Sequence, residues 1–240
     1  MALKNSLLVN CIYPAFMGEH NKHGIGCPCT FVRLAGCNLR CYMRTKGITC
    51  DTPEALEGKS GKIMSVGEIV NEVLHLGRKL VCLTGGEPLR QDCIELLEQL
   101  SSWGCQVVVE TNGSMGIGMY RNIPNVSFVV DYKSSSTGES EKMLHANYGF
   151  MDEDDVLKFV VDTMEDYNEM KKWVIANGSH FRGKIAVGLF WGSQMGYQEL
   201  MKELLHDDLQ VYVNMQTHKM SCLYDRYKGK LADIIIPKDL

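Results

Sequence analysis

Apolar and polar positions along the chain follow two different patterns. Short runs that are apolar at nearly every position, such as KLVCLTGG at 79–86 and VSFVVDYK at 126–133, predict strands buried on both faces. Stretches with apolar residues at helical spacing lie between them. One is SVGEIVNEVLHLG at 65–77, where Ser65 suits an N-cap and Glu68 follows three residues later. Helices placed between buried strands favour a parallel sheet covered by helices.

The remaining elements continue this alternation. Further helices are expected at 88–104, 165–178 and 197–207, and further strands at 30–35, 105–113, 155–162, 183–192 and 209–219. The order predicts an α/β fold of about six βα units, fewer than a closed barrel needs, and therefore a partial, incomplete parallel β/α barrel. We expect a single domain over residues 1–240, because the sequence shows no repeat, low-complexity tract or linker.

Polar turns follow several of the predicted strands. TGGEP, ETNG, DYKSSS and QTHK come at the ends of the strands that begin near residues 79, 105, 126 and 209. In open parallel sheets, ligands bind at the carboxyl ends of the strands. The convergence of these turns therefore predicts a binding site at that edge.

Composition and charge narrow the class of protein. The chain has 240 residues, of which 45% are hydrophobic and 22% charged, and a net charge of −4. These values fit a globular domain, and the acidic balance disfavours nucleic acid or an anionic membrane as partner. Without a run of 18 apolar residues or a convincing cleavage site near the start, we expect a cytoplasmic protein with no membrane span.

The ten cysteines fall into two groups. Some stand among apolar residues or follow a possible last strand and are expected to be buried core thiols: Cys11, Cys82, Cys93, Cys105 and Cys222. Others gather within a short segment and are candidate ligands: Cys27, Cys29, Cys37, Cys41 and Cys50.

Spacing alone leaves the ligand open. Thiolates from Cys37, Cys41 and Cys50 on one loop can hold three irons of a cubane cluster and leave the fourth iron open to another ligand. A structural zinc site that uses Cys27 and Cys29 with the first two of these thiols is an alternative, and unliganded thiols are another.

A family resemblance rests on the motifs just quoted. GCNLRC followed by the cysteine of CDT, then TGGEP and ETNG, resembles the radical S-adenosylmethionine superfamily. Within it, PAFMGEH, FVRLAGCNLRC, VDYKSSS, VLKFVV and QTHK are similar to the 7-carboxy-7-deazaguanine synthase family, over about residues 10 to 220. The superfamily usually spaces its thiols C-x3-C-x2-C. This chain has C-x3-C-x8-C, as if 42–49 carried six extra residues, which a loop can absorb at small entropic cost.

The resemblance implies cofactors and their ligands. Cys37, Cys41 and Cys50 would bind a [4Fe–4S] cluster, with Cys29 as an alternative third ligand, and the open iron would bind S-adenosylmethionine. No side chain is expected to act as the catalyst, because the cofactor radical does so. The residues expected to contact S-adenosylmethionine are Gly85, Gly86, Glu87, Glu110, Asn112, Lys133, Ser134 and Ser135. The structural alternative is that these residues only form ordinary turns and loops.

The implied reaction converts 6-carboxy-5,6,7,8-tetrahydropterin to 7-carboxy-7-deazaguanine with loss of ammonia. Arg33 and His218 would bind the substrate carboxylate, Glu19 would accept hydrogen bonds from the pterin N–H groups, and Asp51 would orient substrate. Thr52 would hold Mg²⁺. A solvated loop, a surface strand or a capped turn is the plain structural alternative for each.

The resemblance also implies a reductant protein such as a flavodoxin or ferredoxin, and a possible homodimer. Two other functions stay open. One is an activase for a glycyl-radical enzyme, which would also carry a cluster. The other is a non-catalytic zinc module that binds RNA or protein, which the net charge of −4 and the alternating α/β pattern disfavour.

Overall fold

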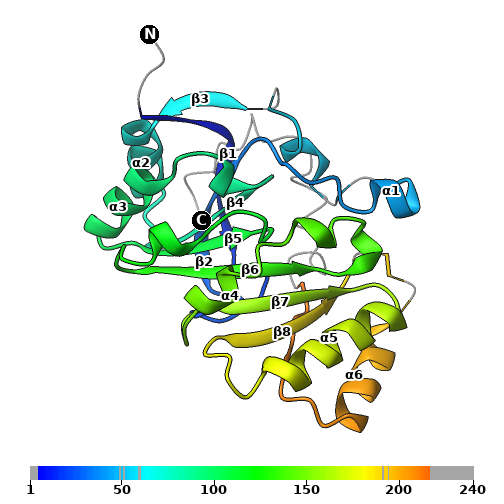
Figure 1. The fold of residues 1–240 in the computed structure, drawn as a ribbon. Helices are drawn as coiled ribbons and strands as arrows, with labels where there is room; N and C mark the ends of the chain where they lie inside the picture. Colours follow the sequence, from blue (N-terminus) through cyan, green and yellow to red (C-terminus); the bar gives the residue numbers. More distant parts are fainter. Residues whose placement is uncertain are drawn as a thin grey trace.

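The fold is built on one mixed sheet, seen in a computed structural model that describes residues 5–48, 50, 52–58, 61–190, 192–193 and 195–216. The sheet has nine strands in the order β3-β1-β2-β4-β5-β6-β7-β8-β9 (Figure 1). The strands are β1 (Ser6–Phe16), β2 (Pro28–Leu34), β3 (Lys62–Ser65), β4 (Leu80–Gly85), β5 (Gln106–Thr111), β6 (Val126–Lys133), β7 (Val156–Val161), β8 (Lys184–Leu189) and β9 (Tyr212–Val213).

The strand pairings confirm the partial barrel and correct one part of the prediction. From β2 through β4 to β9 every neighbouring pair is parallel, and the sheet ends at β3 and β9 without closing. However, β1 pairs antiparallel with both β2 and β3. Neither β1 nor β3 was predicted from the sequence. The burial of β1 alternates from Ser6 to Ile12, through the bulge between Val9 and Cys11, but Tyr13, Pro14 and Ala15 are all half-buried, so the second half of the strand has no period.

The helices connect the parallel strands. They are α1 (Met43–Lys46), α2 (Val66–His75), α3 (Ile94–Ser102), α4 (Asn147–Phe150), α5 (Met164–Asn177) and α6 (Tyr197–His206). Short 3-10 turns occur at Pro53–Ala55, Pro88–Arg90, Gly118–Tyr120, Ser135–Thr137 and Ser140–Lys142. The predicted capping box of α2 is present: the Ser65 side chain accepts a hydrogen bond from the Glu68 N–H. The helix expected at 88–104 is divided, because the turn at Pro88 precedes α3.

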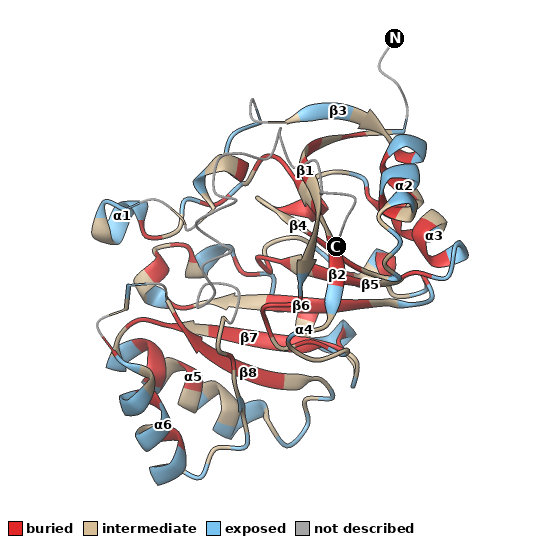
Figure 2. Cartoon of the chain, turned by 180° about the vertical axis from the view of Figure 1, so that it is seen from behind, coloured by how far each residue is buried: buried red, intermediate tan, exposed pale blue. Residues whose placement is uncertain are grey.

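Two hydrophobic clusters cover the two faces of the sheet. The larger joins one face to α2, α3, α5 and α6, for example through Leu97, Phe128 and Tyr167. The smaller lies on the other face, which we call the inner face, and contains Met17, Cys29, Cys82, Val108, Val129, Val156 and Ala186. Figure 2 shows burial concentrated in β7 and β8 and exposure on the outer sides of the helices. Of the cysteines expected in the core, Cys11, Cys82, Cys93 and Cys105 are buried, and Cys222 lies outside the described residues.

Within the described ranges no helix is long and apolar enough to cross a membrane.

Candidate functional site

The inner face becomes polar towards the carboxyl ends of its strands. Side chains two residues apart on a strand share a face, so Thr84 follows Cys82, Glu110 follows Val108, Asp131 follows Val129, and Lys158 follows Val156. A charged layer therefore lies directly beyond the apolar one. The TGGEP, ETNG and DYKSSS turns lie at this edge, at the ends of the parallel neighbours β4, β5 and β6, whereas only Gln216 of QTHK is among the described residues.

Lys158 is the centre of the charged layer. Its ammonium forms ion pairs with Glu19 and, at 2.8 Å, with Asp131. Asp131 also pairs with Lys133, and Gln216 Nε2 donates a 2.7 Å hydrogen bond to Glu19 Oε1. The strand register explains part of this network, since Asp131 and Lys158 are direct partners on β6 and β7.

The electrostatics of these carboxylates follow from their partners. Burial alone would raise the pKa of Glu19, but the attraction of Lys158 brings that pKa below its ordinary value. Burial also opposes ionisation of Asp131, and Lys133 and Lys158 together lower its pKa. Both acids are therefore ionised at neutral pH.

Glu110 behaves differently. Its described hydrogen-bond partners are uncharged: Thr84 Oγ1 donates a 3.1 Å hydrogen bond to Glu110 Oε2, and the Cys82 thiol also hydrogen-bonds to Glu110. No ion pair joins it to a described cation. Burial, and then the charge of Glu19, raise the pKa of Glu110 to about 7. The layer thus holds an acid that carries a proton near neutral pH.

The sequence analysis missed Lys158, Asp131 and Gln216. A signal for the first was present in VLKFVV, where one lysine interrupts an otherwise apolar strand. A buried lysine needs an anionic partner, and that reasoning would have placed it beside a carboxylate.

Arg33 lies at the end of β2, on the first strand of the parallel series. Its guanidinium donates to Glu54 Oε1 at 3.3 Å and to Tyr13 Oη at 3.2 Å. Its buried Nε has no partner among the described residues. One donor therefore stays available for an anionic ligand.

The glycines of TGGEP have a steric role. A Cβ on Gly85, whose φ is 139°, would lie 2.0 Å from the Leu34 carbonyl oxygen, and a Cβ on Gly86 would lie 2.4 Å from the Gly36 carbonyl oxygen. These glycines therefore allow the turn after β4 to pack against the backbone that leads into Cys37.

Glu87 is entirely engaged by its own loops. It is fully buried and accepts hydrogen bonds from Thr111 Oγ1 at 2.8 Å, Asn112 N at 2.7 Å and Leu89 N at 3.0 Å. Burial raises the pKa of Glu87 to about 7 in spite of these donors. The side chain ties the TGGEP turn to the ETNG turn.

The ETNG turn is in turn tied to the cysteine loop by a closed ring of side chains. Asn112 Nδ2 donates to Asn38 Oδ1 at 3.1 Å, Asn38 Nδ2 donates to Ser114 Oγ at 2.8 Å, and Ser114 Oγ donates to Asn112 Oδ1 at 2.6 Å. Asn112 Nδ2 also lies 3.7 Å from Cys37 Sγ, and Leu39 N lies 3.5 Å from that sulfur. Such N–H···S contacts are typical around cluster thiolates.

The three predicted cluster ligands are half-buried cysteines. Burial raises the pKa of Cys41, and the neighbouring Cys37 raises it further. Lys133 lies near enough to Cys41 and Cys50 to feel the charge of both thiolates. No three Cys, His, Asp or Glu side chains of the described residues already form a metal-binding group. The donor chemistry, the N–H···S contacts and the nearby cation nevertheless fit a thiolate-bound cluster.

The described geometry disfavours the alternatives that need Cys27 and Cys29. Cys27 precedes β2 and donates to the His23 carbonyl at 2.9 Å, whereas Cys37 follows β2. A strand rises roughly 3.3 Å per residue, so the seven-residue β2 separates these thiols by roughly 20 Å. Cys29 is buried in the apolar cluster of the inner face, near the start of β2, which disfavours it as a ligand together with Cys37.

Ser134 and Ser135 lie just after β6. Ser134 is buried, and its hydroxyl lies 3.4 Å from the Val160 carbonyl oxygen. The Ser135 N–H donates to Glu169 Oε2 at 3.0 Å.

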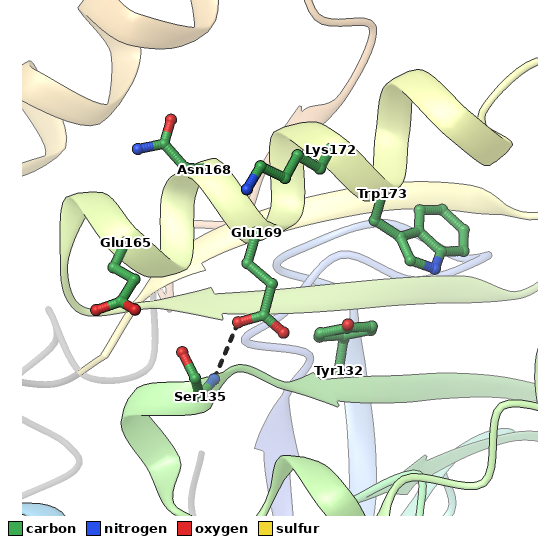
Figure 3. Close-up of a pocket in the computed structure, with 7 residues that line it drawn as sticks. All are labelled: Tyr132, Ser135, Glu165, Asn168, Glu169, Lys172 and Trp173. Carbon is green, nitrogen blue, oxygen red and sulfur yellow. Dashed lines mark hydrogen bonds between the residues drawn. The ribbon is translucent and has the colours of Figure 1, made fainter.

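Ser135 belongs to a groove between β6 and α5, on the face away from the charged layer. The groove encloses about 790 Å³ and is lined by Tyr132, Ser135, Glu165, Asn168, Glu169, Lys172 and Trp173 (Figure 3). Tyr132 points into this groove, whereas Asp131 and Lys133 point to the inner face, because successive side chains of a strand alternate.

The other predicted residues can be placed only in part. Thr52 stands at the N-terminus of the 3-10 turn Pro53–Ala55, where its side chain makes no capping hydrogen bond. Asp51 and His218 lie outside the described residues.

The chain is similar over most of its length to known proteins of one family. No family model matches the chain. It is 33% identical to the 7-carboxy-7-deazaguanine synthase of Methanospirillum hungatei, with 87% of this chain and 82% of that protein covered. The synthase of Chlorobaculum tepidum is 32% identical, with 91% and 96% covered.

The fold has a solved counterpart. The crystal structure of QueE from Escherichia coli superposes with a TM-score of 0.69 at 18% identity, covering 88% of this chain and 93% of that one. Since the sequence relatives are similar over nearly their whole length, the chain belongs to the 7-carboxy-7-deazaguanine synthase family.

Proposed function

We propose that this chain converts 6-carboxy-5,6,7,8-tetrahydropterin to 7-carboxy-7-deazaguanine as a radical S-adenosylmethionine enzyme. The family membership carries this function. The observation that supports the site is the convergence of the cysteine loop, the TGGEP turn and the ETNG turn at one sheet edge, linked through Glu87 and Asn112.

Cys37, Cys41 and Cys50 would hold a [4Fe–4S] cluster. When bound together, the cluster and S-adenosylmethionine supply the one-electron chemistry that starts hydrogen abstraction from the substrate. The chain's own residues have the tasks of binding, orientation and proton placement. Asn112 steadies the Cys37 thiolate through its N–H group, and Lys133 places a positive charge beside Cys41 and Cys50.

The charged layer and Arg33 would bind the organic groups. Glu19, held ionised by Lys158, accepts hydrogen bonds from the amino and ring N–H groups of the pterin. Arg33 offers its unpaired Nε to the substrate carboxylate. Glu110, with a pKa of about 7, can accept a hydrogen bond from a ribose hydroxyl or, when protonated, donate one to it.

Further parts of the proposal follow from the family resemblance. Thr52 would contribute one oxygen to Mg²⁺, which keeps several of its waters and needs few protein ligands. A flavodoxin or ferredoxin would supply the electron, and the enzyme would act as a homodimer in which each chain carries its own cysteine loop.

Anaerobic reconstitution tests the proposal. We expect about four irons per chain and, after reduction, formation of 7-carboxy-7-deazaguanine from the carboxylated pterin in the presence of S-adenosylmethionine, followed by liquid chromatography with mass detection. Cys50→Ala should lose the cluster, and the matched variant Cys29→Ala should keep it. A colourless protein that binds zinc, or a cluster that survives Cys50→Ala but not Cys29→Ala, would contradict the proposal.

A further inference from the structure

The extra residues between Cys41 and Cys50 fold into a defined segment. Tyr42–Ile48, which we call the strap, contains the single turn α1 between two left-handed residues, Tyr42 with φ 63° and Gly47 with φ 66°. The Lys46 N–H donates to the Tyr42 carbonyl at 2.9 Å. A tyrosine in the left-handed region is strained, and such strain persists only where the surrounding structure holds it.

Backbone contacts hold the strap against the turn that follows β6. The Tyr42 N–H donates to the Thr137 carbonyl at 2.8 Å, and Thr45 Oγ1 donates to the Ser136 carbonyl at 2.6 Å. The strap thus reaches from the loop after β2 to the end of β6, across the strands between them in the sheet.

An ion pair and a ring contact extend this attachment to β7 and β8. Lys46 pairs with Asp162, the fully buried residue directly after β7. The Tyr42 ring lies 3.9 Å from the ring of Phe190, directly after β8, and the Lys46 ammonium lies 5.5 Å from the latter ring.

Asp162 depends on this contact. Neither of its carboxylate oxygens has a hydrogen-bond partner among the described residues. Within the same residues, Asp162 forms an ion pair with Lys46. A buried carboxylate that loses its cation is strongly unfavourable. Removing Lys46 should therefore do more than free one surface side chain.

From these contacts we propose that the strap fixes Cys41 and Cys50 relative to each other, and that Lys46 and Asp162 are positioning residues for the cluster thiols. A free eight-residue connection would let Cys50 sample many positions. Anchoring its middle to β6, β7 and β8 leaves only short tethers to each thiol. The positioning role rests on the proposed function, whereas the attachment itself does not.

Hydrogen exchange on the metal-free protein tests the attachment. In Lys46→Met, we expect the amides of Tyr42 and Lys46 to exchange at least about tenfold faster than in the wild type, while Lys46→Arg keeps most of the protection. The matched control is Lys22→Met, which removes the exposed ion pair with Asp154 and should leave the strap unchanged. Unchanged exchange in Lys46→Met, with the rest of the protein folded, would overturn the strap.

Iron release tests the positioning role. With each reconstituted protein exposed to a chelator without oxygen, Lys46→Met and Asp162→Asn should lose iron several-fold faster than the wild type and Lys22→Met. Faster exchange with unchanged iron release would overturn the positioning role. A wild type that takes up no iron would instead refute the proposed function, and the positioning role with it, while the exchange result would still decide whether the strap is attached.

Discussion

The two layers of the inner face differ although they are formed by the same strands. Val108, Val129 and Val156 pack in an apolar cluster, whereas Glu110, Asp131 and Lys158, two residues further on each strand, form a charged layer. The first layer gains stability from burial. The second keeps buried charges that contribute little net stability even when paired. Two residues along a strand therefore separate the part that maintains the fold from the part that we propose to bind ligands.

The largest effect should come from placing a charge in the apolar layer. Val129→Asp buries a carboxylate with no cation on that layer, and we expect it to cost more than about 4 kcal/mol. Urea unfolding, or loss of the protein from the soluble fraction, measures this. Val129→Ala, which leaves only a cavity, is the matched control and should cost about 1–3 kcal/mol. If the aspartate were tolerated as well as the alanine, the division into two layers would be wrong.

A smaller loss is expected from removing the cation of the charged layer. Lys158→Met leaves Glu19 and Asp131 without their shared partner, which should cost about 3–5 kcal/mol at neutral pH. The loss should shrink on acidification, because protonation of the two acids removes their uncompensated charge. Urea unfolding at several pH values checks this. Lys22→Met breaks an exposed pair and should cost at most about 1 kcal/mol. Equal losses in both variants would remove the distinction between the pairs.

The third effect is a gain. Because the pKa of Glu110 in the folded protein is about 7, above its ordinary value, its favourable contribution is complete below pH about 4 and is lost as the pH rises through 7. Glutamine cannot ionise, so the Glu110→Gln variant does not lose stability in this way as the pH rises. Between pH 4 and pH 8, the variant should therefore gain on the order of 3 kcal/mol relative to the wild type.

Urea unfolding across this pH range measures the gain. The exposed Glu153→Gln is the control and should show no such trend. A parallel pH dependence of Glu110→Gln and the wild type would mean that Glu110 is ionised in the charged layer.

Local pattern predicted the parallel strands and the four longer helices, because continuous apolar runs mark these strands and helical spacing marks these helices. The strand at 126–133 was predicted with the bounds that the structure shows. The four-residue helices α1 and α4 were missed because they are too short to show a helical period. β1 was missed because Leu7, Leu8 and Val9 are consecutive apolar residues and its second half does not alternate in burial, and β3 because four exposed or half-buried residues carry little signal.

The candidate site was predictable where motifs mark strand ends. The ion pairs and hydrogen bonds within the site were not predictable, because the partners are distant in sequence. Lys158 and Glu19 are 139 residues apart, and the fold brings them together from β7 and from the connection between β1 and β2. For the glycines of TGGEP, the cofactor contact stays a prediction, and the structure adds a steric reason for both, because a Cβ on either would clash with the backbone of Leu34 or Gly36.

The register of β6 sets where the chain tolerates a change of length. One residue inserted before Asp131 would turn Tyr132 towards the inner face and Asp131 towards α5, since a slip of one position exchanges the faces of a strand. The strap, by contrast, already accommodates additional residues between two thiols. Variation in length among related enzymes should therefore accumulate beside the cysteines and be absent from the strand that carries the acids.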